Sequence, residues 1–396
     1  MSNQEQIEKD VLSVYQKVNP STYQIEKDTD EFKRRMHFME NLFLYRLHFP
    51  PKMFHNASLL EFGTGTGEHS LFYLKNGANC TFVEMNHLAC TRSDNLLKKY
   101  APDDAVYKII NNSLFNYSSD TRYDIVISLG VIHHTGNKEK AFEIKSNYLK
   151  KGGFLVLGIG NSAGAFQRNL QRTIIYQFAK NEDDVVSLAN ELFDEHLSRA
   201  EKFGRRDRKA IIYDSYVNPK HDAARVAEIL NWFSNNGLQL YSSWPPVIPA
   251  ILGDPADRSP VQFNDYPGII TLPETIYFSH SHDDKYPMLE IEQKLDKLLS
   301  PFRNLVDLLS DISPEKPVSY EDVIQSINQF QLKENQINPY YPYTKKMIRL
   351  INEVKLLIIL LQKGDLENIK SFIKDSKELF QGTAGLGMSW YIAYKP

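Results

Sequence analysis

Between residues 57 and 160 the sequence alternates short apolar runs with amphipathic segments, and this alternation constrains the fold more than any other feature. The apolar runs have the length and composition of buried strands, and the segments between them are long enough for helices. The predicted strands cover residues 58–62, 80–83, 106–110, 123–128 and 154–158. Strands that alternate with helices pair in parallel through right-handed crossovers. The sequence therefore predicts a doubly wound α/β sheet.

The remaining segments are predicted to be mostly helical. We expect an N-terminal helical segment (1–57), a helical lid (162–221) within a core of residues 58–244, and a helical insertion (245–383). Residues 384–396 follow glycines and are rich in aromatic and β-branched side chains, which favours a strand. We expect this last segment to return to the sheet as its seventh strand, antiparallel to a sixth strand at 238–243.

Composition excludes several classes of protein. The net charge of −3 offers no global basic field, so binding to nucleic acid is not expected, although a local basic patch would permit it. Cys80 and Cys90 have no metal-ligand spacing, so we expect no metal, and so few cysteines suit a reducing compartment. The N-terminus does not resemble a signal peptide, and the most apolar run, 356–361, is too short to span a bilayer. We therefore expect a cytoplasmic protein that does not bind membranes.

The loop after the first predicted strand is rich in glycine. Gly63, Gly65 and Gly67 allow a tight turn and let a ligand approach the backbone. Glu84 ends the second predicted strand, where a carboxylate can accept both ribose hydroxyls of an adenosine. These features suit NAD and S-adenosylmethionine alike. Glu68, directly after the last glycine, would repel a pyrophosphate and so disfavours a dinucleotide.

Residues 60–67 (LEFGTGTG) and 123–135 (YDIVISLGVIHHT) together resemble the class I S-adenosylmethionine-dependent methyltransferases, in particular their small-molecule-type members. The resemblance covers about residues 57–160 and is weaker up to residue 244 and at the Lys395-Pro396 ending. It implies that S-adenosylmethionine is the cofactor. The residues that it places at the cofactor are Glu61, Gly63 and Gly65 beside the methionine part, Gly67 in the same loop, Glu84 at the ribose, Asn112 and Ser113 near the adenine, and Leu129 and Gly130 beneath the sulfonium.

Candidate residues at the acceptor end follow the fourth strand and end the helical lid. His134 is a candidate general base, or else it caps and packs the turn. The run from residue 213 to 221 offers Asp214 and His221 as further catalytic candidates, and Tyr213, Tyr216 and Asn218 as substrate contacts. Alternatively this run is a turn in which Asn218 and Asp222 cap the next helix.

Two further groups of residues carry competing interpretations. The basic cluster at 202–209 could bind a phosphate or RNA, or form a solvated helix face. Residues from the N-terminal helices could close over the cofactor, namely Tyr15, Tyr23, Arg34 and Arg35.

The function that these patterns favour is methyl transfer to oxygen or nitrogen of a small-molecule metabolite, of a sugar or natural-product type. The strand-four signature of enzymes that methylate planar amino groups is absent, and neither cysteine lies where a pyrimidine C5 methylase keeps its nucleophile. One alternative is an RNA or protein methyltransferase that uses the helical insertion for docking. Others are an NAD-dependent oxidoreductase and a scaffold that binds the cofactor without catalysis. The insertion could also mediate a homodimer.

Overall fold

The computed structural model describes residues 3–18, 29–247, 289–310, 312, 316–334, 342–381 and 387–396. Its seven-stranded sheet has the order β3-β2-β1-β4-β5-β7-β6. The strands are β1 (Ser58–Phe62), β2 (Asn79–Glu84), β3 (Tyr107–Asn111), β4 (Tyr123–Leu129), β5 (Leu149–Gly160), β6 (Gln239–Trp244) and β7 (Met388–Tyr394). β7 is antiparallel to β5 and β6, and the other pairings are parallel. The predicted doubly wound sheet with a returning last strand is confirmed.

Helices cover both faces of this sheet, because strand residues alternate between two apolar cores. Leu60 and Val126 belong to one core, with helices α5 and α10, whereas Leu59 and Ile125 belong to the other, with α3 and α4. The helices around the sheet are α2 (Thr29–Glu40), α3 (Ser70–Lys75), α4 (His87–Tyr100), α5 (Lys138–Asn147) and α10 (Val226–Asn235), with short π or 3-10 turns η1 (Asn41–Arg46), η2 (Pro51–Phe54) and η3 (Ile132–His134).

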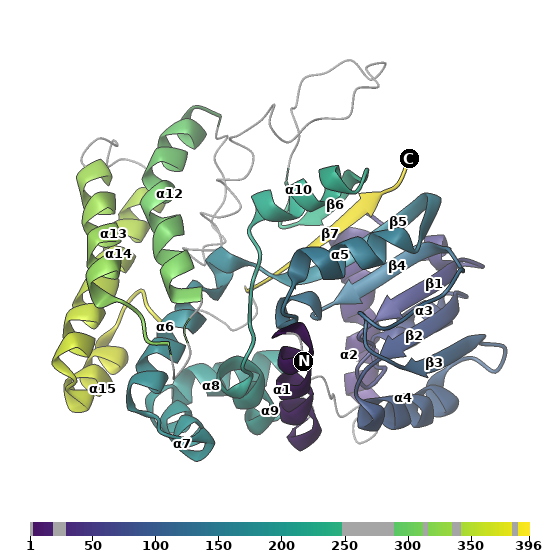
Figure 1. Ribbon diagram of the computed structural model, residues 1–396, viewed down its shortest axis with the longest axis horizontal. Coiled ribbons are helices and arrows are strands. Elements are labelled where there is room, and N and C mark those ends of the chain that lie inside the picture. The colour runs from purple at the N-terminus through teal and green to yellow at the C-terminus, as the bar shows by residue number, and fades with distance from the viewer. Residues whose placement is uncertain are drawn as a thin grey trace.

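A separate helical layer lies beside the sheet (Figure 1). Its members are α6 (Ser162–Phe178), α7 (Glu182–Leu192), α8 (Asp194–Gly204), α9 (Arg208–Ile212), the π-helical turn η4 (Tyr213–Val217), α12 (Leu289–Ser310), α13 (Tyr320–Glu334), α14 (Pro342–Lys363) and α15 (Leu366–Asp375). One hydrophobic cluster runs through this layer, so the helices expected as lid and as insertion share a core. α12 contains Pro301 within its length.

The N-terminal helix α1 (Asn3–Lys17) lies between the sheet and the helical layer (Figure 1). On the sheet side, Ser113 donates a hydrogen bond to Glu8, and the Nδ2 atom of Asn86 lies 3.5 Å from the carbonyl oxygen of Tyr15. On the other side, Lys17 forms an ion pair of 2.7 Å with Glu182 of α7. The helix α1 therefore contacts both the sheet side and the helical layer. Tyr23 lies outside the described residues.

Two local expectations differ from the structure. β5 begins at Leu149 and not at residue 154 as predicted, because residues 387–396 pair with this stretch through Gly152 N to Lys395 O (2.7 Å) and Lys395 N to Gly153 O (3.0 Å).

The cap of α10 also differs from the turn that we considered. Arg225 is the N-cap residue, and its backbone N–H donates to the Glu228 side chain in a capping box. Asp222 instead forms an ion pair of 2.8 Å with Lys138. Among the described residues, no helix is both long and apolar enough to cross a membrane.

Candidate active site

A cavity of about 590 Å³ opens at the carboxyl ends of the central strands. Parallel strands place their connecting loops at this edge, where doubly wound sheets bind ligands. Its wall combines residues of the strand ends with residues of α1, α6, η4 and β7. The predicted site residues in this wall are Glu61, Gly63, Gly65, Glu84, Asn112, Leu129, Gly130, His134, Asp214 and His221.

The glycines in and around the loop have different roles. Gly63 has a φ of +74°, and an added Cβ would lie 2.2 Å from Val131, so this glycine is required for packing. Gly67 has a φ of +88°, and its Cβ would meet Ser93 of α4 at 2.4 Å, so Gly67 faces a helix and does not line the cavity. Gly130 has a φ of +75° and no atom within 4 Å of its Cβ position, which leaves space over its backbone for a ligand.

Two buried acids stand at the strand ends. Glu84 accepts hydrogen bonds from the backbone N–H groups of Gly65 (3.0 Å) and Asn86 (2.8 Å). Burial raises the pKa of Glu84, and these two bonds oppose the shift. Glu61 accepts a hydrogen bond of 2.5 Å from the Ser70 hydroxyl, and burial raises the pKa of Glu61 to about 7. An adenosine hydroxyl or an ammonium group would find an acceptor at either carboxylate.

The two residues predicted near the adenine are placed differently. Asn112 lines the cavity, and its Oδ1 accepts from the Ser113 N–H at 2.8 Å. Ser113 instead bonds Glu8 of α1 and is not part of the cavity wall. The structure therefore brings Asn112 to the site and uses Ser113 to hold α1 over it.

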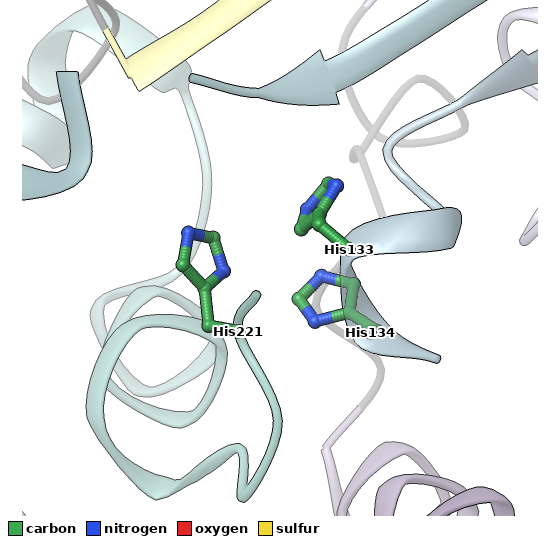
Figure 2. A group of neighbouring side chains, drawn as sticks. All are labelled: His133, His134 and His221. Atoms are coloured by element: carbon green, nitrogen blue, oxygen red, sulfur yellow. The ribbon is translucent and has the colours of Figure 1, made fainter. Parts of the chain in front are cut away.

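Three imidazoles gather at the acceptor end, two from η3 and one from the loop before α10 (Figure 2). The ring centroids of His133 and His134 are 4.1 Å apart, and the His221 ring lies 5.0 and 5.5 Å from these two. Burial, together with neighbouring positive groups, lowers the pKa of all three, so the rings are neutral near pH 7.

The shorter of two contacts at Nδ1 assigns the tautomer of His134. Its Nδ1 lies 2.7 Å from the carbonyl oxygen of Lys220, which can only accept, and 3.2 Å from Nδ2 of Asn218, so we assign the proton to Nδ1 from the shorter contact. Its Nε2 then has a lone pair and lies 3.9 Å from Oδ1 of Asp214. Although burial alone would raise the pKa of Asp214, Arg206, which donates to it at 3.2 Å, and His134 hold that pKa below its usual range. A neutral imidazole beside an ionised carboxylate can accept a proton.

The same three rings have the spacing of a metal site, since their nitrogen atoms lie within 4.8 Å of one another. However, Nδ1 of His133 accepts from the Gly160 N–H (3.3 Å), and Nε2 of His221 lies 3.3 Å from the guanidinium of Arg168, which only donates. Two of the three lone pairs are therefore engaged, and the guanidinium charge would repel a cation. This arrangement suits a neutral hydrogen-bonded cluster better than a metal ion.

The predicted run from 213 to 221 is divided between the cavity and the helical core. Tyr213 donates to Glu182 (2.7 Å), and Tyr216 is buried with its hydroxyl on Gln171 (2.9 Å), so neither lines the cavity. Asn218 lies behind the site, with its Nδ2 3.2 Å from Nδ1 of His134 and 3.4 Å from the hydroxyl of Tyr15. Consecutive residues of a helical turn point in different directions, and the sequence pattern alone did not resolve this.

The residues of the basic cluster at 202–209 also have different surroundings. Arg206 lines the cavity, whereas Arg208 is bound by Asp194 and Glu201 of α8. Tyr15, Arg34 and Arg35, which the sequence analysis named as residues that could close over the cofactor, line the same cavity.

Sequence reasoning missed Arg168, Met388 and Trp390, which also line the cavity. The sequence does contain a signal for Arg168, because Arg168 and Arg172 are spaced one helical turn apart on the helix that follows the fifth strand.

A sheet of this order, with β7 reversed, a glycine loop after β1 and an acid ending β2, is the architecture of the class I methyltransferases, whose methyl donor is S-adenosylmethionine. Residues 32–195 match the family model described as a methyltransferase domain. The chain therefore carries a class I S-adenosylmethionine-dependent methyltransferase domain, and the alternative of an NAD-dependent oxidoreductase is set aside. The comparison with curated proteins gave no match.

Solved structures that resemble the chain do so at low identity. The N-methyltransferase NodS from Bradyrhizobium japonicum WM9, in complex with S-adenosyl-L-homocysteine, is 16% identical over 40% of this chain and 74% of its own, with a TM-score of 0.30. A Burkholderia thailandensis 1,6-didemethyltoxoflavin-N1-methyltransferase is 14% identical over 41% and 66%, with a TM-score of 0.30. The glycopeptide N-methyltransferase MtfA is 19% identical over 28% and 50%, with a TM-score of 0.26. None of these likenesses identifies an acceptor for this chain.

Proposed function

We propose that this enzyme transfers a methyl group from S-adenosylmethionine to the oxygen of an O–H group or the nitrogen of an N–H group in a small-molecule metabolite, with His134 as the general base. The observation that carries the proposal is that Nε2 of His134 lies 3.9 Å from Oδ1 of Asp214 in the same cavity as Glu84 and Gly130. One cavity thus holds both an adenosine-type site and a proton acceptor.

In this proposal the cofactor lies across the carboxyl ends of β1, β2 and β4. Glu84 would hold the ribose hydroxyls and Asn112 the adenine edge, while the open space at Gly130 would receive the sulfonium. Glu61 would face the ammonium of the methionine part. Tyr15 and α1 would cover the bound cofactor, since α1 is tied to Ser113 at the strand ends.

The protein's own chemical contribution is alignment and proton transfer. The bound cofactor supplies an activated methyl group for in-line displacement by the acceptor. His134 would take the acceptor's proton at Nε2, because Nδ1 is already committed to the Lys220 carbonyl. The imidazolium formed would be stabilised by Asp214, whose carboxylate Arg206 holds in place at 3.2 Å.

The surroundings favour a metabolite over RNA or a protein. Strand ends, α1, α6 and η4 all contribute to the cavity wall, which makes a concave site of the size that small ligands occupy. Two members of the basic cluster, Arg206 and Arg208, are paired with acids, which reduces the positive charge that the cluster can offer to an RNA backbone. The scaffold alternative is disfavoured because the base and its carboxylate partner are both in place.

The test follows the transferred methyl group. The enzyme is incubated with S-adenosylmethionine labelled in the methyl group and with small-molecule, RNA and protein fractions of a cell extract. We expect the label in the small-molecule fraction, and a loss of about 100-fold or more in rate for His134→Gln, the range of general-base catalysis. S-adenosylhomocysteine should bind the variant as it binds the parent. Label that enters only RNA or protein, or a fully active His134→Gln, would contradict the proposal.

A further inference from the structure

We propose that the methyl acceptor carries an anionic oxygen group, a carboxylate or a phosphate, and that Arg168 binds it. This inference rests on the proposed function, because it assigns the substrate class of the same site. Arg168 projects from α6, directly after β5, and lines the cavity together with His134 and His221.

Arg168 has more hydrogen-bond donors than partners. Its guanidinium offers five N–H groups. Within the part of the chain that the structure describes, its one hydrogen bond joins Nη1 to Nε2 of His221 at 3.3 Å, and no carboxylate lies within 4.0 Å of it. The side chain is half-buried, so water reaches it only in part. A guanidinium in such a place favours an anion as its partner.

The neighbouring arginines donate to oxygen acceptors of the protein, which distinguishes Arg168 from them. Arg172, one turn further along α6, donates to the carbonyl oxygens of Ser215 (3.3 Å) and Asn218 (3.2 Å). Arg206 donates to Asp214 at 3.2 Å. The guanidinium groups of Arg172 and Arg206 therefore bind other parts of the protein.

Positive charge exceeds negative charge around Arg168, because Arg172 and Arg206 lie close enough to interact with it and Arg172 is bonded only to neutral carbonyl oxygens. His133, His134 and His221 are neutral because burial lowers the pKa of each ring. Asp214 attracts Arg168 as well as Arg206, but among the described residues it forms its arginine ion pair, of 3.2 Å, with Arg206. Nδ1 of His221 is buried without a hydrogen-bond partner among the described residues, so it too can donate to a ligand.

An anion on Arg168 would have a positioning effect. The guanidinium binds His221, whose ring stands 5.5 Å from that of His134, so an anchored acceptor would lie next to the base. A flat guanidinium can hold a carboxylate or a phosphate through two parallel hydrogen bonds, which fixes orientation as well as place.

The experiment uses the full chain saturated with S-adenosylhomocysteine, so that the cofactor's own carboxylate is already bound. Inorganic phosphate, benzoate and the neutral benzamide are titrated separately at constant ionic strength, and the unfolding midpoint is followed as a function of concentration. The variants are Arg168→Gln and Arg168→Lys, and the matched control is Lys202→Gln, which removes an exposed cation of α8.

We expect phosphate or benzoate, and not benzamide, to stabilise the parent saturably. Arg168→Gln should weaken this binding at least tenfold and Arg168→Lys by less, while Lys202→Gln should have no effect. Tighter binding of benzoate would indicate that the acceptor carries a carboxylate, and tighter binding of inorganic phosphate would indicate a phosphate. The inference is overturned if neither anion binds, if Arg168→Gln and Lys202→Gln bind alike, or if Arg168→Gln loses S-adenosylhomocysteine, which would assign Arg168 to the cofactor. A parent that does not bind S-adenosylhomocysteine would instead refute the proposed function.

Discussion

At the scale of single residues, burial sets the charge of the acids that face the cavity. Glu61 and Glu84 are both buried, and burial raises the pKa of each. Glu84 keeps two backbone N–H donors that favour its ionised form, whereas Glu61 has only hydroxyl partners, and its pKa rises to about 7. Because the pKa of Glu61 is about 7, a bound ligand can change the protonation state of this carboxyl group at neutral pH.

Cofactor binding should release a proton from Glu61. In the free protein Glu61 is protonated below a pH of about 7, and an adjacent ammonium would favour the carboxylate. The affinity for S-adenosylhomocysteine should therefore rise from pH 6 to pH 8, by up to about tenfold per pH unit on the acidic side. Glu61→Gln should remove this dependence. Calorimetry in two buffers of different ionisation enthalpy measures the proton, and parent binding without proton release would place the ammonium elsewhere.

Sequence reasoning reached the site residues that lie in contiguous motifs and missed those that tertiary packing assembles. Gly63 and Gly65 were found because the loop itself requires glycine, and Glu84 because it ends a predicted strand. Arg168 was missed because only folding brings α6 against His221, a partner distant in the sequence. Tyr216 was grouped with the site by proximity in sequence, yet its side chain lies in the helical core.

At the scale of elements, α6 holds the π-helical turn that presents Asp214. Gln171, Arg172 and Tyr176 of α6 bond η4 and the residues after it: Gln171 receives the Tyr216 hydroxyl, and Tyr176 donates to the Tyr216 carbonyl at 2.6 Å. A π-helical turn leaves backbone groups displaced from the regular pattern, and such turns are frequent at functional sites. The position of Asp214 therefore depends on α6.

Removing the Arg172 contacts should loosen this turn. Arg172→Gln leaves the buried carbonyls of Ser215 and Asn218 without their charged donor, which should lower the free energy of unfolding by about 1.5–3 kcal/mol. Methyl transfer should slow because Asp214 shifts, while the affinity for S-adenosylhomocysteine stays unchanged. Denaturation and rate measurements test this, with Lys202→Gln, at an exposed position of α8, as a surface control of no more than about 0.5 kcal/mol. Equal effects of the two variants would remove the proposed role of Arg172.

The types of the elements could be predicted, but several boundaries could not. Asp365 is the N-cap of α15, where its side chain accepts from the Asn368 N–H at 3.2 Å. Such caps are local and therefore visible in the sequence. β5 begins earlier than predicted because its first residues pair with Lys395, at the far end of the chain. That partner is not visible within a sequence window.

At the scale of the whole molecule, the sheet and the helical layer have separate cores, and the chain passes between them. The apolar stripe of α14, which includes Met347, Val354 and Leu361, is fully buried within the helical layer. That stripe is core and is not available to a second subunit, so a homodimer through the insertion, which stays a prediction, would need other residues. Among the described residues of the helical layer, Phe203, Leu332 and Leu356 are large apolar side chains exposed at the surface.

Two adjacent leucines of α14 test whether the layers unfold together. Leu357 is buried and Leu356 is 49% exposed, so Leu357→Ala should cost about 2–5 kcal/mol and Leu356→Ala no more than about 0.5 kcal/mol. The three tryptophans, Trp232, Trp244 and Trp390, all lie in α10, β6 and β7, so their fluorescence reports on the sheet side.

In a urea titration of Leu357→Ala, fluorescence and circular dichroism should shift to the same lower midpoint. The reason is that α6 continues directly from β5 and β7 inserts between β5 and β6, so loss of the helical layer releases the strands as well. A circular dichroism midpoint that falls while the fluorescence midpoint stays with that of Leu356→Ala would instead show a helical layer that unfolds independently of the methyltransferase sheet.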